Sequence, residues 1–340
     1  MRRVLMFRGV GDVAVEAAEM PVLAADEVLV ETAVSAISAG TEMLLYRGQM
    51  PPNLAVDETI EALDGTFSYP LPYGYACVGY VVETGMAVDP NWLGRLVFAF
   101  QPHQTHFAAR PEQLLPVPQG ISPETAVFLP NMETAVSFVM DGRPVIGEQV
   151  VVFGQGVVGL LTTMLLAEMP LAALVTLDGY ALRRDWSRRL GAMAVFDPAD
   201  ENAVEAVRDS LPVTGYDGAD LIYELSGNPQ ALAEAIEVAG FNGRILIGSW
   251  YGRKEARLPL GGRFHRAHMQ LISSQVSHLH PRWRGRWNKK RRLELTWQML
   301  ARHNPARLIS HRILFAQAPQ AYELLDTQPN TAVQVILTYG

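Results

Sequence analysis

The 340-residue chain has a single cysteine, Cys77, and no low-complexity tract. One cysteine excludes a disulfide framework and a cysteine-rich structural zinc lobe, and it fits a reducing compartment, so we expect a cytoplasmic protein. Arg8 and Gly9 interrupt the apolar start of the chain, so the sequence predicts no secretory signal. With 49% apolar and 19% charged residues, the chain can bury a large core and is long enough for two domains.

A long uninterrupted apolar run is also missing. The most apolar window, residues 150–177, contains Gln155, Glu168, Pro170 and three glycines. These residues interrupt the apolar window. Such interruptions are typical of a strand, a turn, a helix and a second strand rather than of a membrane span. We therefore expect no membrane partner.

Acidic residues are absent from the segment 257–292, which has a net charge of +10. Its basic residues are Arg257, Arg263, Arg266, Arg282, Arg284, Arg286, Lys289, Lys290, Arg291 and Arg292. The rest of the chain has 18 basic and 35 acidic residues, hence a net charge of −17 there. The segment either pairs with the acidic remainder or a second subunit, or recognises an anionic small-molecule substrate through arginine forks. A nucleic-acid partner is disfavoured, because the whole chain is acidic and contains no nucleic-acid module.

The stretch VVVFGQGVVGLLTTMLLA has the dinucleotide-binding pattern G-x-G-x-x-G between an expected strand and an expected helix. Gly154 permits a tight turn, Gly156 lets the backbone approach a pyrophosphate, and Gly159 lets the helix pack closely on the strand. Val157 and Val158 begin the helix, whose N-terminus attracts phosphate. The stretch therefore predicts a cofactor site.

The next expected strand, ALVTLD, ends in Asp178, nineteen residues after Gly159. A carboxylate about 20 residues after the glycines typically accepts hydrogen bonds from the adenosine ribose hydroxyls. Asp178 therefore predicts NAD(H) rather than NADP(H), although Arg183 follows closely enough to soften that preference.

Further strand and helix patterns follow along the chain, in LGAMAVFDP, ENAVEAVRDSL, DGADLIYELSGNP, PQALAEAIEVAG and NGRILIGSWYG. Their alternation predicts an α/β fold with a doubly wound parallel sheet. Ligands bind at the carboxyl ends of such strands, so we expect Ser226, Gly227 and Gly248 to lie under the nicotinamide.

The N-terminal region differs, because short β-type runs separated by Gly, Pro and Asn predict a mostly-β domain. This domain order, with GTEMLLYRG, PYGYACVGYVVETG, GRLVFAF and SHRILFAQAPQAYELL, resembles the medium-chain dehydrogenase/reductase superfamily. The resemblance implies a GroES-like catalytic domain at residues 1–125 and 305–340, and a Rossmann domain at 126–304. It also implies a homodimer joined edge to edge through the strand near QLISSQVS.

The resemblance also locates three positions at which zinc-using members have ligands. Here these positions are Ala39, Tyr75 and, near the entry to the linking helix, Pro130. We therefore expect no catalytic zinc. The stretches SAISAGTEMLLYRGQMPP and PLPYGYACVGYVV are most similar to the zinc-less branch that contains bacteriochlorophyllide dehydrogenase.

The turn ISAGTE, residues 37–42, is predicted to close a strand and open a helix, with its hydroxyls as possible helix caps. By the resemblance, Thr41 is the hydroxyl that relays the substrate proton; as an alternative it only caps the helix. Tyr75 either donates a hydrogen bond to the substrate oxygen or fills a cavity. His103 is either a general acid/base or an ordinary turn histidine. Glu42 is expected to orient the turn.

These patterns together predict a zinc-independent, NAD(H)-linked oxidoreductase that interconverts a secondary alcohol and a ketone by hydride transfer. Two alternatives stay open at this point. One is a zinc-less reductase of carbon–carbon double bonds, of the quinone or enoyl type, and the other is an NAD(H)-binding redox sensor without turnover.

Overall fold

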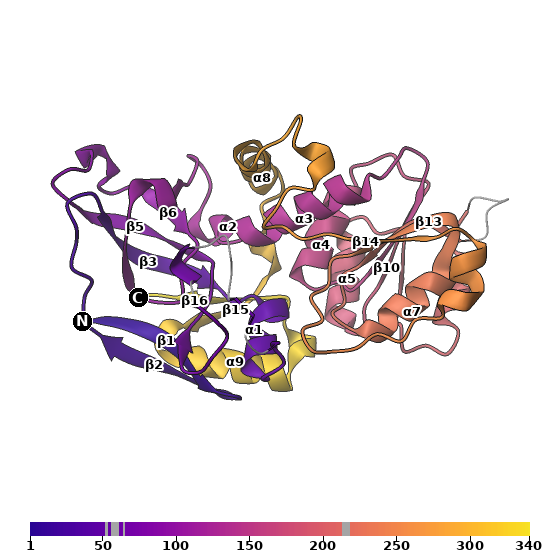
Figure 1. Cartoon of the computed structure of the whole chain (residues 1–340), viewed down its shortest axis with the longest axis horizontal. Helices are drawn as coiled ribbons and strands as arrows, with labels where there is room; N and C mark the ends of the chain where they lie inside the picture. The colour runs from indigo at the N-terminus through magenta and orange to yellow at the C-terminus, as the bar shows by residue number, and fades with distance from the viewer. Residues whose placement is uncertain (52–53, 56–60, 64, 213–217) are drawn as a thin grey trace. The chain divides into compact units, whose positions relative to one another are not determined.

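The chain forms two compact units, which Figure 1 shows in a computed structural model. The first unit comprises Met1–Pro130 and Trp297–Gly340, and the second comprises Asn131–Thr296. The structure describes residues 1–51, 54–55, 61–63, 65–212 and 218–340.

The first unit is built mainly of strands. Among its described residues, a seven-stranded sheet has the order β15-β16-β3-β5-β6-β8, with β7 paired to β3. Its strands are β3 (Val28–Ala36), β5 (Cys77–Thr84), β6 (Leu96–Ala99), β7 (His106–Ala109), β8 (Leu115–Pro116), β15 (Ile309–Leu314) and β16 (Gln334–Thr338). A three-stranded sheet contains β1 (Arg2–Gly9), β2 (Asp12–Ala18) and β4 (Leu71–Pro72). The expected mostly-β character of this region is confirmed.

Among the described residues, helices that accompany these sheets include α1 (Ala39–Tyr46), α2 (Pro123–Ala126) and α9 (Ala318–Thr327). Helix α8 (Lys289–His303) begins in the second unit and ends in the first. The start of α2 shows why the sequence folds as it does, because the Ser122 hydroxyl accepts a hydrogen bond from the Thr125 N–H at 3.2 Å and proline occupies the first helical position. Helix α9 packs into the core between the sheets through Ala318, Ala321 and Tyr322.

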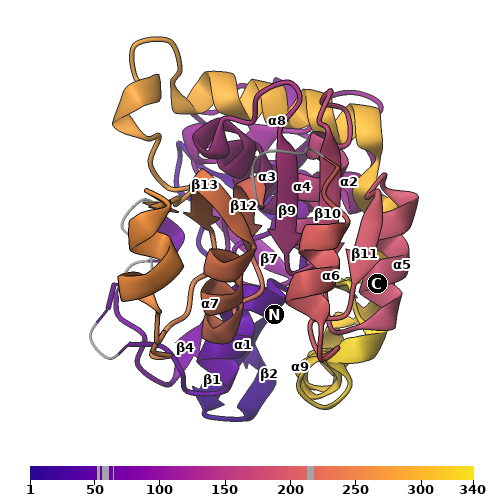
Figure 2. The ribbon, with the colours of Figure 1, turned by 90° about the vertical axis from the view of Figure 1, so that its right-hand side faces the viewer.

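The second unit contains a parallel sheet. Within its described residues six strands have the order β11-β10-β9-β12-β13-β14, and all pair in parallel. They are β9 (Gln149–Phe153), β10 (Ala173–Leu177), β11 (Ala194–Phe196), β12 (Ala219–Glu224), β13 (Ala239–Ile247) and β14 (Gln270–Ser273). In Figure 2 the eye can follow β13, β12, β9, β10 and β11 across this sheet.

Helices cover both faces of the parallel sheet. They are α3 (Leu129–Gly142), α4 (Val157–Leu166), α5 (Ala181–Arg189), α6 (Ala203–Asp209) and α7 (Pro229–Val238). Val151 and Phe153 of β9 pack with residues of α6 and α7, whereas Val150 and Val152 pack with residues of α3 and α4. Alternate residues of one strand therefore enter opposite layers, as a strand buried on both faces requires. The predicted doubly wound α/β fold is confirmed.

The apolar window 150–177 forms β9, α4 and β10, as the glycines and polar residues that interrupt it predict. Across the residues that the structure describes, no helix has both the length and the apolar character needed to cross a membrane.

The turn ISAGTE joins β3, which ends at Ala36, to α1, which begins at Ala39, so the predicted strand-to-helix turn is confirmed. The expected cap is wrong in one respect, because the Ser38 hydroxyl does not cap the helix. The carboxylate of Glu42 instead accepts the Ser38 N–H at 2.7 Å, and Glu42 thereby orients the turn as the sequence predicts.

Cys77, at the start of β5, is fully buried. Its Sγ atom lies 3.3 Å from the Gln101 carbonyl oxygen and 3.4 Å from that of Pro102. Burial raises the pKa of the thiol well above its ordinary value, so the sulfur stays protonated and unreactive in the folded chain.

Candidate functional site

Three glycines shape the turn between β9 and α4. Gly154 has φ +88°, and a Cβ atom there would lie 2.5 Å from the Ser226 Cα. A Cβ at Gly159 would lie 2.0 Å from the Gly154 carbonyl oxygen. Gly156 differs, since the space beside it is open. The first and third glycines are thus fixed by backbone packing, whereas the second leaves room for a ligand to approach the main chain.

The turn is held rigid by the buried side chain of Gln155. Its Nε2 donates to the Gly154 carbonyl oxygen at 3.0 Å, and its Oε1 accepts from the Thr163 hydroxyl at 3.0 Å. Val157 and Val158 are the first residues of α4, and Gly156 supplies no side chain to cap it. A helix start without a side-chain cap next to open space fits the phosphate groups of a dinucleotide.

Asp178 follows the carboxyl end of β10 and is 7% exposed. Its Oδ2 accepts the Gln155 N–H at 2.7 Å and its Oδ1 accepts the Tyr180 N–H at 2.8 Å, so two backbone donors fix the carboxylate beside the glycine turn. An Arg183 Nη1 lies 4.0 Å from Oδ2, and its guanidinium stacks on the Tyr180 ring. The glycine turn and this carboxylate together have the arrangement of a dinucleotide site, in which Asp178 keeps acceptor capacity on both of its oxygens.

The structure brings the predicted strand-end residues together. The Gly227 N–H donates to the Ser249 hydroxyl at 2.8 Å, and the Gly248 N–H donates to the Glu224 carbonyl oxygen at 3.0 Å. Ser226 donates both its N–H, at 2.9 Å, and its hydroxyl to the Glu224 carboxylate. These contacts order the carboxyl edge of β12 and β13, where parallel sheets bind ligands.

The sequence-based reasoning missed Glu224, which is fully buried at the end of β12. The Tyr251 hydroxyl also donates to this carboxylate, and burial, then the charge of Glu224, raises the Tyr251 pKa so that the phenol stays a donor. The available signal was an acid directly after the run LIY at the end of the strand ADLIYE, because a buried carboxylate needs donors around it.

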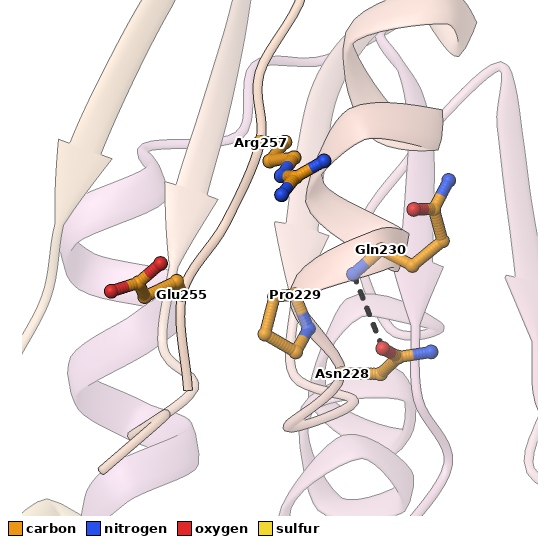
Figure 3. A pocket seen from close by; sticks show the side chains of 5 residues that line it. All are labelled: Asn228, Pro229, Gln230, Glu255 and Arg257. Carbon is orange, nitrogen blue, oxygen red and sulfur yellow. Dashed lines mark hydrogen bonds between the residues drawn. The ribbon is translucent and has the colours of Figure 1, made fainter. Parts of the chain in front are cut away.

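A pocket of about 310 Å³ opens next to this edge, at the start of α7 (Figure 3). It is lined by Asn228, Pro229, Gln230, Glu255 and Arg257. The Asn228 side chain accepts the Gln230 N–H at 3.1 Å and so caps the helix. The lining offers hydrogen bonds to a polar ligand.

The substrate-side candidates lie in the first unit. The Tyr75 hydroxyl donates a hydrogen bond to the Ser38 hydroxyl, and both residues are partly exposed. Thr41 lies in the first turn of α1, also partly exposed, and its N–H donates to the Ser38 carbonyl oxygen at 3.1 Å. Ser38, which the sequence-based reasoning considered only as a helix cap, therefore joins Tyr75 to the turn that carries Thr41. Whether Thr41 and Tyr75 act in catalysis stays a prediction.

His103 is fully buried, and both of its ring nitrogens are engaged. Its Nδ1 lies 2.7 Å from the Ser35 hydroxyl and its Nε2 lies 3.1 Å from the Glu42 carboxylate. Glu42 is also fully buried and accepts a hydrogen bond from the Tyr322 hydroxyl at 2.5 Å. Burial, reinforced by the Glu42 charge, holds the Tyr322 pKa well above its ordinary value. This placement favours a structural task for His103 over the predicted acid/base task, which stays untested.

The three positions at which the sequence resemblance places zinc ligands carry no His, Cys, Asp or Glu side chain in this chain. Ala39 has only a methyl group, Pro130 has no ligating atom, and the Tyr75 phenol is directed to Ser38. In the described parts of the chain, no three His, Cys, Asp or Glu side chains are grouped as metal ligands would be.

Comparisons with known proteins agree with this architecture. Residues 157–289 match the family model "Zinc-binding dehydrogenase". The matched range lies outside Ala39, Tyr75 and Pro130 and covers the nucleotide-binding part instead. The chain is 27% identical over 335 residues to D-guloside 3-dehydrogenase of Escherichia coli, and the alignment covers 93% of each chain.

Two solved structures share the fold over nearly the whole chain. One is 2R,3R-butanediol dehydrogenase from Bacillus subtilis, with a TM-score of 0.81, 17% identity and 99% of each chain covered. The other is a putative zinc-binding dehydrogenase from Sinorhizobium meliloti bound to NADP, with a TM-score of 0.78, 19% identity and 99% of each chain covered.

The fold is thus that of the medium-chain dehydrogenases, and the comparisons support a place in the medium-chain dehydrogenase/reductase superfamily. The relatives named here are all dehydrogenases by name. Membership of the zinc-less branch stays a prediction.

Proposed function

We propose that the chain is a zinc-independent, NAD(H)-linked oxidoreductase that interconverts a secondary alcohol and a ketone. The proposal rests on the hydrogen bond from Tyr75 to Ser38. This bond joins two hydroxyl groups at a position where a zinc-using enzyme would have a metal ligand. The glycine turn and Asp178 supply the cofactor side of the same proposal.

In this proposal, hydroxyl groups of the first unit bind the substrate oxygen. When bound, the nicotinamide supplies a hydride acceptor or donor. When substrate binds, the Tyr75 phenol turns its single O–H from Ser38 to the carbonyl or alkoxide oxygen, and Ser38 then donates to the phenol oxygen. Thr41 donates a second hydrogen bond to the same substrate oxygen. Donors already in place stabilise developing negative charge without the reorganisation that water would need.

NAD(H) is the proposed cofactor because Asp178 is fixed and nearly buried. A 2′-phosphate beside this carboxylate would meet a negative charge with little screening, whereas free ribose hydroxyls can donate to it. Arg183, 4.0 Å away, lowers this discrimination without removing it.

The test is turnover in the presence of an exhaustive chelator. NAD⁺ reduction is measured with a panel of secondary alcohols that includes 2,3-butanediol and a D-guloside, and NADH oxidation with matched ketones and enones. We expect turnover of alcohols and ketones, unaffected by chelation, from protein without stoichiometric zinc by elemental analysis. Activity with enones alone would support the double-bond reductase, and NADH binding without any turnover would support the sensor.

A matched pair of variants tests the role of the phenol. Tyr75→Phe removes the hydroxyl that meets the substrate oxygen, and we expect kcat to fall by roughly 10²-fold, the typical loss when one oxyanion donor is removed. Tyr80→Phe is the control, because Tyr80 is 44% exposed on β5. Equal kcat values for the two variants would exclude the proposed role of Tyr75.

A homodimer belongs to the same proposal. Strand β14 is the last strand of the parallel sheet in the described part of the chain, and its Leu271 and Ile272 are half-buried. Pairing this edge with the same edge of a second chain would satisfy its free backbone groups.

The basic segment has two parts in the structure. Arg292 is buried, whereas Arg282, Arg284 and Arg286 are exposed. We propose that the exposed arginines contact a second copy of the acidic chain. An anionic substrate is the alternative partner.

A further inference from the structure

A network of buried and partly buried hydrogen bonds crosses the first unit. The Tyr339 hydroxyl lies 2.8 Å from the Ser35 hydroxyl, which lies 2.7 Å from Nδ1 of His103. Nε2 of the same ring lies 3.1 Å from the Glu42 carboxylate, which also accepts from Tyr322.

One assignment of protons satisfies every member of this network. Because a carboxylate only accepts hydrogen bonds, Nε2 of His103 carries the proton that it shares with Glu42. Nδ1 then accepts from the Ser35 hydroxyl, and Ser35 accepts from Tyr339. The pKa of Tyr339 is raised by burial, so its phenol stays a donor. This assignment, made from the partners of each group, gives every hydrogen bond of the network one donor and one acceptor.

His103 contacts both segments that carry the Tyr75–Ser38 hydroxyl pair. On one side it holds Glu42, whose other oxygen accepts the Ser38 N–H at 2.7 Å. On the other side it lies against Gly74, the residue before Tyr75. Gly74 has φ +118°, and a Cβ atom there would lie 2.5 Å from the ring. The His103 N–H also donates to the Tyr73 carbonyl oxygen at 3.2 Å.

We propose that His103 is a positioning residue that sets the distance and direction between the Ser38 and Tyr75 hydroxyls. This inference rests on the proposed function, in which the Tyr75 hydroxyl meets the substrate oxygen and Ser38 fixes its direction. The imidazole acts through Glu42 on the turn before α1 and by direct packing on the turn at Gly74. It exchanges no proton with substrate, because it is fully buried and both of its nitrogens are engaged.

The first experiment compares three variants of the full chain with the turnover probe of the preceding section. His103→Leu removes both hydrogen bonds of the ring, and His103→Gln keeps a donor that can reach Glu42. His106→Gln is the control, because His106 is partly exposed at the start of β7. We expect kcat to fall roughly 10²-fold in the leucine variant, as for a misplaced catalytic group, and much less in the glutamine variant. KM and the NADH Kd should stay within about twofold, the scatter expected when binding contacts are kept.

A double-mutant cycle separates positioning from general damage to the fold. If His103 acts through the hydroxyl pair, His103→Leu should cost little further kcat once Tyr75→Phe has removed the phenol. A loss of equal size in both backgrounds, at a temperature where all variants are folded, would overturn the proposal.

A second measurement needs no substrate. We expect faster hydrogen–deuterium exchange in His103→Leu at residues 37–42, whose Ser38 N–H depends on Glu42, and unchanged exchange in His106→Gln. Unaltered exchange at 37–42 would overturn the positioning role. If no alcohol or ketone is turned over, the proposed function fails while the exchange result still decides how His103 acts on the turn.

Discussion

Replacing Arg292 by methionine should destabilise the second unit more than any exposed charge change in the chain. Only 1% of the Arg292 side chain is exposed, and Nη2 lies 2.8 Å from the Glu133 carboxylate, of which 5% is exposed. The same guanidinium donates to the Ser137 hydroxyl at 3.0 Å and to the Val276 carbonyl oxygen at 2.7 Å. Arg292→Met leaves the Glu133 carboxylate buried without its cation and the Val276 carbonyl without this donor.

The expected cost follows from these contacts. Removing one partner of a buried ion pair typically costs about 3–5 kcal/mol, because the remaining charge stays desolvated. For a cooperative unit of about this size, each kcal/mol lowers Tm by roughly 2–4 °C, so we expect a decrease of roughly 6–20 °C. The double variant Arg292→Met with Glu133→Met should recover at least half of the loss, since no buried charge is left unpaired.

Thermal unfolding followed by circular dichroism measures these changes. Arg312→Met is the matched control, because Arg312 makes two hydrogen bonds of 2.7 Å to Glu124, but 49% and 35% of the two side chains are exposed. An exposed pair of this kind contributes about 1 kcal/mol or less. Equal Tm values for Arg292→Met and Arg312→Met would refute the reasoning, and so would a double variant less stable than Arg292→Met alone.

Three further outcomes are expected. Asp178→Ser should weaken NADH binding roughly tenfold or more, because hydrogen bonds to a charged group are lost, while NADPH binding changes less; fluorescence titration measures both, and tighter NADPH binding by the unchanged chain would contradict the assignment. Arg282→Ala with Arg286→Ala should lower the dimer fraction with KM little changed, whereas a salt-dependent rise in KM would indicate an anionic substrate. Light scattering should give twice the 37.5 kDa of one chain, and Ser273→Pro should give monomer; a monomeric parent chain would exclude this dimer. Proline at 273 removes an N–H on the outer edge of β14, because the N–H of the next residue, Ser274, donates to Ile247 of β13 on the other side.

The nucleotide-binding unit could be predicted from local patterns in the sequence. The glycine turn, Asp178 and the alternation of strands and helices are encoded within short stretches, because each depends on neighbours along the chain or on strand ends that meet at one edge. Gly154 illustrates this, since its φ of +88° follows from the tight turn that its sequence context requires.

Contacts between distant residues could not be predicted in the same way. His103 meets Glu42 across 61 residues, and Arg292 meets Glu133 across 159. No spacing rule predicts whether a histidine is buried, or which of the ten basic residues of the segment 257–292 forms a buried ion pair, because burial is a property of the packed core. The role of Ser38 was missed for the same reason, since its partner Tyr75 lies 37 residues away.

The rate at which a reagent modifies the single thiol reports how often the first unit unfolds. Cys77 is sealed in the core of the first unit, so a thiol reagent can modify it only when that unit opens. The Arg292 pair, by contrast, belongs to the second unit. Timed labelling of Cys77 in Arg292→Met therefore tells whether the two units melt together or one after the other. Labelling that keeps the parent rate while circular dichroism records a lower transition would show separate melting, with no probe engineered into either unit.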